Sequence, residues 1–283
     1  MATEWQWDET LFAGTAQYYR RGRLPYAPGL ADMLADVLRL DGRGRLLDVG
    51  CGPGTLAVGL AHLFGEVAGV DPDPGMIAEA RRWAEEAGVA DKASWTRARA
   101  EEVPAGLGTF TAASFGQSFH WMRRDVVAAT VRDMLRPGGV LLHISDVKPK
   151  DAAERPSVEG LPHPAIPHAA VTELVRDYLG PVRRAGRGVL PHGTPNDEAT
   201  VFARAGFRGP EHHIAPGGQP LERSSDDIVA RVFSMSLSAP HQFGDRRAEF
   251  EADLRNLLRR ASPDELFSER QPATEVHIWR KAS

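Results

Sequence analysis

Three glycines alternate with other residues at the point where an apolar segment ends. The segment is LLDVGCGPGTL, residues 46–56, with glycines at Gly50, Gly52 and Gly54. Glycine has no Cβ and tolerates positive φ, so a Gly-x-Gly-x-Gly turn between a strand and a helix lets the backbone approach a ligand closely. The spacing therefore predicts a ligand-binding turn.

A carboxylate stands at the end of the next apolar segment, where Asp71 follows Gly54 by 17 residues. In folds with a glycine-rich first turn, an acid here accepts hydrogen bonds from ribose hydroxyls, and an ionised carboxylate can accept from two donors. The turn and the acid together predict a nucleoside-binding site. Dinucleotide sites use G-x-G-x-x-G, whose third glycine comes one position later than Gly54, so the spacing disfavours a nicotinamide cofactor.

The elements that must position these groups alternate between short apolar runs and amphipathic runs from residue 45 to residue 146. This alternation is typical of βαβ units and a mostly parallel sheet. The expected strands are residues 45–50, 66–71, 93–98, 110–116 and 140–146. The expected helices between them are residues 54–64, 75–88 and 125–135, and residues 28–40 form a further helix ahead of the block. Residues 136–139, RPGG, should end the last of these helices and turn the chain.

The alternation stops after residue 146, and three parts of the chain follow. Residues 1–44 are expected to form an N-terminal arm and helix that cover the site, residues 45–146 the binding core, and residues 147–283 the rest of the fold with a helical addition for substrate specificity. In the last part, residues 147–171 are rich in Pro and His and indicate a loop. The expected helices there are 171–180, 197–207, 226–238 and 247–262, with strands at 207–215 and 274–281.

Composition limits the class of protein. Hydrophobic residues make up 42% of the 283 residues and the formal net charge is −4, which is ordinary for a globular protein and gives no general attraction to nucleic acid. We find no apolar run of transmembrane length and an acidic, aromatic N-terminus unlike a signal peptide, so we expect a cytoplasmic protein without a membrane partner. Cys51 is the single cysteine, which fits a reducing compartment. The bias toward Arg over Lys suggests a GC-rich bacterial source. The sequence permits a homo-oligomer but does not indicate one.

The sequence resembles the class I S-adenosylmethionine-dependent methyltransferases, in particular the bacterial small-molecule group with a type 11 core. The resemblance rests on LLDVGCGPGTLAVGLA, VAGVDPDPGMIAEAR, RAEEVP and MLRPGGVLLHI, which occur in this order within residues 14–146. It implies an α/β, Rossmann-like, seven-stranded, mostly parallel sheet with helices on both faces and an antiparallel last strand pair. It also implies S-adenosyl-L-methionine as cofactor and O-, N- or C-methylation of a small molecule, as in bacterial secondary metabolism.

The resemblance assigns roles to individual residues. Asp48, Gly50 and Gly52 would face the methionine part of the cofactor, and Asp71 would accept the ribose hydroxyls. Pro72 and Met76 would pack on the adenine ring. The family commonly has Asp where this chain has Arg99, and that Asp accepts a hydrogen bond from the adenine amino group. In this chain the accepting role would pass to Glu101 or to the backbone of Ala100. Gln117 would contact the cofactor. For Asp48, a role in capping the turn through backbone amides is an equal alternative.

Four further side chains are candidates for the acceptor side of the site. His120 is placed to act as a general base for a hydroxyl acceptor and, with Trp121, to contact the substrate, although it could instead only orient Trp121 or a loop. In similar enzymes the arm folds over the cofactor, so Tyr18 would line the cofactor and Tyr19 the substrate. The alternative is that both tyrosines only anchor the arm.

The remaining candidates for chemistry are weaker. Cys51 is expected to pack rather than react. The histidines at 163, 168, 192, 212 and 213 lie among prolines without tight ligand spacing, so we expect no metal site. Two other functions stay open: a nicotinamide-dependent oxidoreductase, and a protein of the same fold that binds the cofactor but catalyses a non-methylating reaction such as a cyclisation.

Overall fold

The computed structural model describes Asp8 and residues 10–103, 106–147, 157–182, 184–185, 188–189 and 197–282. The chain folds into two compact units, and each unit is assembled from separate parts of the sequence. Unit 1 comprises Met1–Pro25, Lys148–Gly193 and Gly217–Pro272, and unit 2 comprises Tyr26–Val147, Thr194–Pro216 and Ala273–Ser283. No helix in the described ranges combines the length and the apolar character that crossing a bilayer requires.

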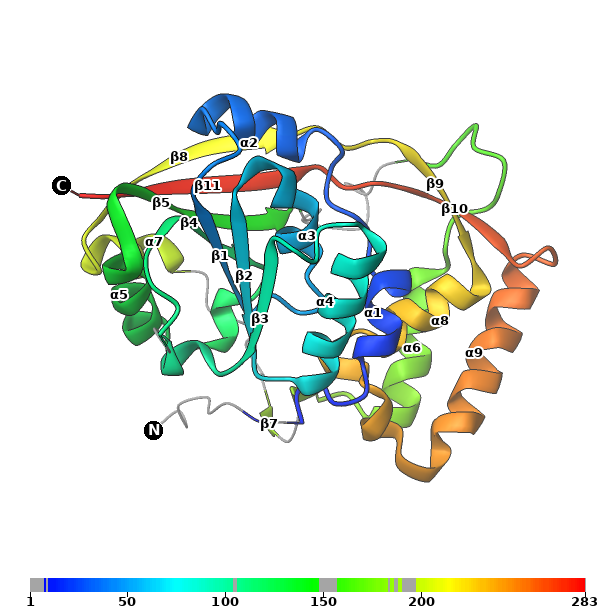
Figure 1. Cartoon of the computed structure of the whole chain (residues 1–283). Helices are drawn as coiled ribbons and strands as arrows, with labels where there is room; N and C mark the ends of the chain where they lie inside the picture. Colours follow the sequence, from blue (N-terminus) through cyan, green and yellow to red (C-terminus); the bar gives the residue numbers. More distant parts are fainter. Residues whose placement is uncertain are drawn as a thin grey trace. The chain divides into compact units, whose positions relative to one another are not determined.

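Unit 2 is built on a seven-stranded sheet in the order β3-β2-β1-β4-β5-β11-β8 (Figure 1). Its strands are β1 (Arg45–Val49), β2 (Glu66–Asp71), β3 (Ala93–Arg97), β4 (Phe110–Gly116), β5 (Leu135–Asp146), β8 (Phe207–Ala215) and β11 (Thr274–Lys281). The pairings among β1 to β5 are parallel, and β11 runs antiparallel to both of its neighbours, β5 and β8. The predicted mostly parallel sheet with an antiparallel last strand is therefore confirmed.

Helices cover both faces of this sheet because its strands carry apolar side chains on both sides. On one face α2 (Leu30–Leu38) and α3 (Thr55–Leu60) pack with Leu46, Val67 and Leu142, and α4 (Pro74–Glu86) packs beside α3 against β2 and β3. On the other face α5 (Arg124–Met134) and α7 (Glu198–Arg204) enclose a second core. Three short 3-10 helices complete the unit: η1 (Ala61–Leu63), η2 (Ala100–Glu102) and η3 (Phe119–Trp121).

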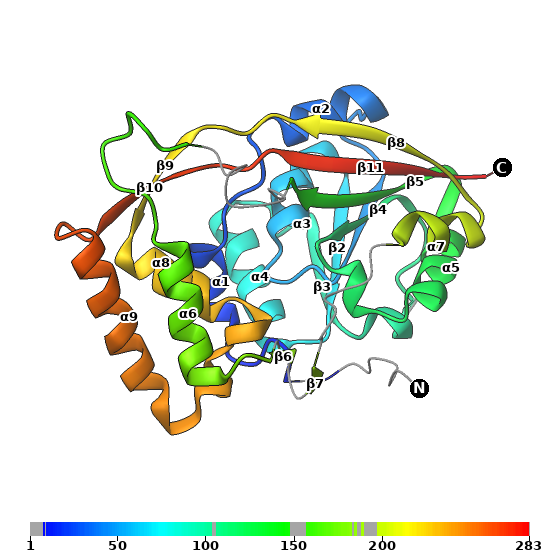
Figure 2. The same ribbon diagram turned by 180° about the vertical axis from the view of Figure 1, so that it is seen from behind.

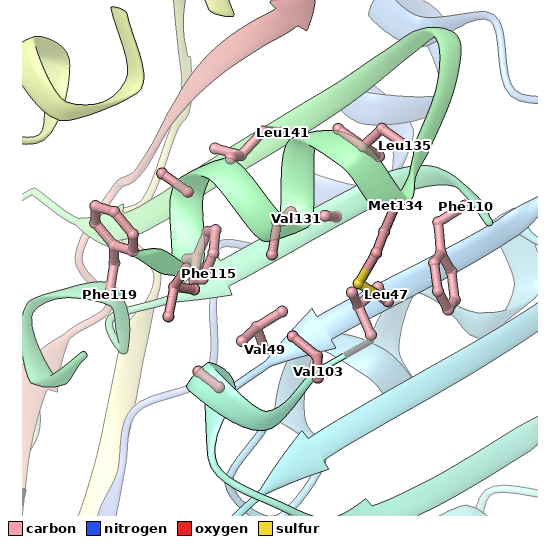
Figure 3. Packing of buried hydrophobic residues seen from close by; sticks show 14 of the residues in the cluster. Leu47, Val49, Val103, Phe110, Phe115, Phe119, Val131, Met134, Leu135 and Leu141 are labelled. Carbon is pink, nitrogen blue, oxygen red and sulfur yellow. The ribbon is translucent and has the colours of Figure 1, made fainter. Parts of the chain in front are cut away.

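The second core holds the strand ends that carry the candidate site. Figure 3 shows Val131 and Met134 of α5 above the sheet and Leu47 and Val49 on β1 beneath them. Phe115 near the end of β4 and Phe119 in η3 beyond it continue this core, with ring centroids 4.8 Å apart. Each buried Phe or Leu contributes about 1.5–3 kcal/mol to folding, so the segment after β4 is held firmly at its start.

Unit 1 is mainly helical. Its elements are α1 (Ala16–Gly22), α6 (His168–Leu179), β6 (Arg184–Ala185), β7 (Gly188–Val189), β9 (Pro220–Ser224), α8 (Ser225–Phe233), η4 (Ser236–Ser238), η5 (Pro240–Arg246), α9 (Arg247–Ala261) and β10 (Leu266–Arg270). Figure 2 shows α6, α8 and α9 side by side in this unit. Phe243 stacks on Phe250 at 4.1 Å, and both rings pack against Phe233.

Three local expectations from the sequence differ from the structure. The predicted arm contains a helix, α1, whose seven residues are too few to show a clear period. The antiparallel pair β9 and β10 was not predicted, because PLERS and LFSER are largely polar. The RPGG segment lies within β5 as an irregularity, since the register with β4 shifts between Phe110 and Ala112, and the expected strand itself begins at Val140.

Candidate functional site

The candidate site lies where the parallel strands of unit 2 end. The chain leaves β1 toward α3 on one face of the sheet and leaves β4 toward η3 and α5 on the other. This point, where neighbouring strands send their connections to opposite faces, is where open α/β sheets bind ligands. The predicted glycine turn follows β1, and the segment that contains His120 follows β4, so the two predicted groups meet here.

The glycine turn is held in shape by its own backbone. The amides of Gly50 and Cys51 both donate to the carbonyl of Val70, at 2.8 and 3.0 Å, and Gly54 N donates to the carbonyl of Cys51 at 3.0 Å. The turn is thereby fastened to the last residues of β2. A bound ligand would meet a preformed surface, which reduces the entropy lost on binding.

The three glycines of the turn all have positive φ, but each position is glycine for a further reason of its own. A Cβ at Gly50 would lie 2.7 Å from Ser118 Cβ and 2.9 Å from Met122 Cε, so glycine is needed there to admit the segment after β4. A Cβ at Gly54 would lie 2.8 Å from the Trp95 ring. At Gly52 a Cβ would meet nothing within 4 Å. Gly52 is therefore the position where the turn faces open space and where a ligand can lie against the backbone.

Asp71 joins the end of β2 to this open position. Its Oδ2 accepts a hydrogen bond from Gly52 N at 2.9 Å, and its Oδ1 accepts one from Asp73 N at 2.9 Å. Each carboxylate oxygen can accept a second bond, so both retain capacity for a ligand hydroxyl. Burial raises the pKa of Asp71 from 3.8 to about 6, against the opposing effect of these two amides. The geometry fits the predicted role of accepting from a ribose.

Asp48 is buried beneath the turn, on β1. Its Oδ1 accepts from the hydroxyl of Ser114 on β4 at 2.8 Å, and its Oδ2 accepts from Ala57 N on α3 at 3.3 Å. Burial is the main cause that raises the pKa of Asp48 from 3.8 to about 7, and the negative charge of Asp71 raises it further. The bond to Ala57 is a turn-stabilising contact with a backbone amide, which agrees with the capping alternative for Asp48. Ser114 was not predicted, and its only sequence signal is a polar residue inside an apolar strand.

The two acids determine which ligands the site favours. Both carboxylates lie at the same turn, and each is raised in pKa because burial penalises its charge. A cationic ligand group would lower that penalty, whereas a pyrophosphate would add negative charge beside them. The electrostatics of the turn thus favour a positively charged nucleoside over a dinucleotide.

The segment after β4 is bound to the neighbouring strand ends. Gln117 has a positive φ of 55° and donates from Nε2 to Asp146 Oδ2, at the end of β5, at 2.9 Å. Ser118 is buried, and its hydroxyl donates to the carbonyl of Val49 at 2.6 Å. His120 and Trp121 follow, half-buried, with their ring centroids 4.7 Å apart. The close contact between these two rings agrees with either reading of His120, as a base or as a partner of Trp121.

The predicted adenine contacts lie around the ends of β2 and β3. Met76 is buried, and its amide donates at 2.9 Å to Oδ1 of Asp73, the residue that caps the start of α4. Pro72 is half-buried. Ala100 is buried in η2. Glu101 Oε1 accepts from Arg123 N at 2.8 Å, and its Oε2 lies 3.5 Å from Arg99 Nε. A carboxylate with these partners still has room to accept from an adenine amino group, and that role stays a prediction.

Tyr18 and Tyr19 belong to α1 of unit 1, whereas the seven-stranded sheet belongs to unit 2. The Tyr18 ring lies 5.2 Å from Phe233, and its hydroxyl accepts a hydrogen bond from Arg247. Arg23 lies over the Tyr19 ring at 4.9 Å. These contacts agree with the anchoring alternative, and the predicted cofactor and substrate contacts of the two residues stay predictions.

Cys51 is buried beside the turn, and burial together with the charges of Asp71 and Asp48 raises the pKa of its thiol well above the usual value. The thiolate is the nucleophilic form, so this environment opposes reactivity. His192 and residues 148–156 of the predicted Pro-rich loop lie outside the described residues.

Comparison with known proteins agrees with this geometry. A sequence model of the methyltransferase domain matches residues 46–139, which include the glycine turn, Asp71 and the segment after β4. The chain is 44% identical over 59 residues to a ubiquinone biosynthesis O-methyltransferase of Azorhizobium caulinodans, covering 21% of this chain and 22% of that protein. It is 32% identical over 130 residues to an uncharacterized methyltransferase of Mycobacterium bovis, covering 46% of this chain and 49% of that protein. The match thus spans half or less of these relatives.

The fold is shared over a longer range. The solved structure of an S-adenosylmethionine-dependent methyltransferase from Thiobacillus denitrificans, in complex with S-adenosyl-L-homocysteine, aligns with 95% of this chain and 97% of its own. The TM-score is 0.52 and the sequence identity 18%, so this likeness concerns the fold.

Proposed function

We propose that this chain, of which residues 46–139 match a methyltransferase domain, is a class I S-adenosylmethionine-dependent methyltransferase that binds S-adenosyl-L-methionine and transfers its methyl group to a small-molecule acceptor. The observation that carries the proposal is the contact between Gly52 N and Asp71 Oδ2 at the open position of the turn. It joins a surface without side chains to an acceptor for ribose hydroxyls, within the residues that match the family.

The residues of the turn fit this cofactor in shape and charge. A Cβ at Gly52 would fill the space that a ligand is expected to occupy, and Asp71 keeps acceptor capacity on both oxygens. Asp48 and Asp71 supply negative charge, which suits the sulfonium and the ammonium group of S-adenosylmethionine. When bound, this cofactor supplies a methyl group that its sulfonium makes electrophilic.

The protein then has to orient the acceptor and exclude water. The segment after β4 is held by Ser118 and Gln117, and this would position His120 and Trp121 on the acceptor side. Holding the acceptor atom about 3–3.5 Å from the methyl carbon and in line with its bond can lower the barrier by about 7–11 kcal/mol. An amine or carboxylate acceptor needs no strong base, and for a hydroxyl acceptor the His120 imidazole would take the proton.

The direct test is product formation. The protein is incubated with S-adenosylmethionine and fractions of small-molecule extract, and S-adenosylhomocysteine is quantified against an Asp71→Ala variant. Acceptor-dependent S-adenosylhomocysteine from the wild type, and little from the variant, is the expected result. Tight NAD binding without S-adenosylmethionine binding would instead support an oxidoreductase, and cofactor binding with substrate turnover but no S-adenosylhomocysteine would support a non-methylating reaction.

A further inference from the structure

Three histidines form a row across the last three strands of the unit 2 sheet. His143 on β5 pairs directly with His277 on β11, and His277 pairs directly with His212 on β8. Directly paired residues point to the same face of a sheet. The ring centroids of His143 and His277 are 6.3 Å apart, and the rings of His277 and His212 stack at 4.6 Å.

A carboxylate joins the outer part of this row. Glu275 lies two residues before His277 on β11, so it faces the same side. Its Oε2 lies 3.5 Å from His212 Nε2. Each of His212, Glu275 and His277 offers one ligand atom, and these three atoms lie within 4.8 Å of one another.

A neighbouring hydroxyl orients the carboxylate. Ser145 on β5 pairs with Glu275, and its Oγ donates to Glu275 Oε1 at 2.9 Å. The other oxygen, Oε2, is the one turned toward His212. Hydrogen bonds of this kind fix the ligating atom in protein metal sites.

We propose that His212, Glu275 and His277 bind a divalent transition-metal ion, with Zn²⁺ as the reference case, on the face of the sheet shared with His143. Two imidazoles and one carboxylate are a recurrent three-ligand set for Zn²⁺ and Fe²⁺, and they leave coordination positions open for water or another small ligand. Metal bonds of about 2.0–2.2 Å place the ligand atoms about 3–3.5 Å apart, which small side-chain rotations reach from the present arrangement.

The charge around the row also favours a cation. Glu198, on α7, interacts electrostatically with His277, so a further carboxylate besides Glu275 faces this part of the sheet.

The spacing of histidines along the sequence could not reveal this site, because His212 and His277 come from distant segments that meet only in the sheet. From the sequence we expected no metal site, and the pairing of β8 with β11 revises that expectation. The proposal is independent of the proposed function, since none of the three ligands belongs to the glycine turn or to Asp71.

Untagged protein is titrated with ZnCl₂ by calorimetry, and with Co²⁺ while the visible absorption of the metal is followed. We expect one Zn²⁺ per chain, and Co²⁺ bands that disappear on addition of Zn²⁺. His212→Ala and His277→Ala should each lower the affinity by about 100-fold, and Ser145→Ala by about 10-fold, because outer-shell partners cost about 10–100-fold.

His213→Ala is the matched control. His213 is the next residue on β8 and pairs with Val276, whose side chain belongs to the core on the other face of the sheet. Its substitution should leave the Zn²⁺ affinity unchanged. Absence of saturable Zn²⁺ binding by the wild type, or equal losses in His213→Ala and His212→Ala, would overturn the proposal. Circular-dichroism melts of each variant show that it is folded under the titration conditions.

Discussion

The backbone amide of Gly52 donates a hydrogen bond to Asp71 Oδ2 at 2.9 Å. This bond joins the turn after β1 to the end of β2, and it fixes the distance between the position open to a ligand and the carboxylate expected to recognise a ribose. It also fixes the direction of one carboxylate oxygen before any ligand arrives.

Asp71→Asn should weaken binding of S-adenosylhomocysteine by about 10- to 100-fold, because the amide cannot accept through both terminal atoms and a ribose hydroxyl loses its partner. Calorimetry measures the dissociation constant. Glu66→Gln is the control, since Glu66 lies at the other end of the same strand and pairs with Arg45 on the surface. An unchanged dissociation constant in Asp71→Asn would place the nucleoside elsewhere.

Gly52→Ala and Gly54→Ala should separate binding from stability. Alanine at Gly52 meets no neighbour and costs about 1–2 kcal/mol from its positive φ, yet its methyl group occupies the space expected for the cofactor. Alanine at Gly54 also collides with Trp95, and overpacking of this kind adds about 1–3 kcal/mol. Denaturant unfolding should therefore show that Gly54→Ala is the less stable variant. Calorimetry should show that Gly52→Ala loses more affinity for the cofactor than its smaller loss of stability would suggest. The reverse ranking would contradict the assignment of Gly52.

Asp48 should contribute a loss of stability as pH rises from about 4 to 7, opposed over much of that range by His143, whose pKa burial lowers to about 4. The folded pKa of Asp48, about 7, lies above its ordinary value of 3.8, so in this range the unfolded chain has lost a proton that the folded protein still holds. The slope for one such group is at most about 1.4 kcal/mol per pH unit. Urea unfolding at several pH values isolates the Asp48 contribution: the free energy of unfolding of Asp48→Asn relative to that of the wild type should increase from pH 4 to 7, and identical slopes would refute the raised pKa.

The affinity for S-adenosylmethionine should rise with pH. Protonated Asp48 and Asp71 offer no negative charge to a sulfonium, which S-adenosylmethionine carries and S-adenosylhomocysteine lacks. Calorimetry therefore compares the dissociation constants of the two ligands between pH 5.5 and 8. The cationic S-adenosylmethionine should gain more affinity as both acids ionise, since their pKa values are raised to about 7 and about 6. Equal gains for the two ligands would show that the acids do not face the sulfonium.

His120→Gln tests the proposed base once a hydroxyl acceptor is known. General bases contribute about 10²- to 10⁴-fold, so kcat should fall by that order while the dissociation constant of the cofactor stays the same. His62→Ala, at an exposed position in η1, is the control. A rate that survives the substitution intact would leave His120 only a positioning role.

The sequence predicted the sheet well, and also the edge of the sheet where the candidate site lies, because both depend on local patterns. The alternation of apolar runs marked the five parallel strands of the central sheet, local patterns near the C-terminus marked β8 and β11, and the turn residues at Gly50 to Gly54 marked the end of β1. What it missed depends on distant partners. Ser114 became a partner of Asp48 only through the pairing of β4 with β1, and the separate reasons for Gly50 and Gly54 needed Ser118 and Trp95 in place.

The same limit applies to the histidines and to unit 1. The sequence drew attention to His212 beside His213 but not to His143 or His277, and strand pairing alone brings His143, His212 and His277 into one row. The sequence divides into three consecutive parts, whereas each compact unit of the structure draws on segments from both halves of the chain. Helix periodicity located α6, α8 and α9 but carried no information about which of them would share a core.

The central claim is tested most directly by a crystal structure of the protein soaked with S-adenosylhomocysteine. The account predicts density along the turn at Gly52, with the ribose hydroxyls within hydrogen-bonding distance of the Asp71 carboxylate. Density for the nucleoside at another place, or none at a concentration that saturates binding in solution, would contradict it.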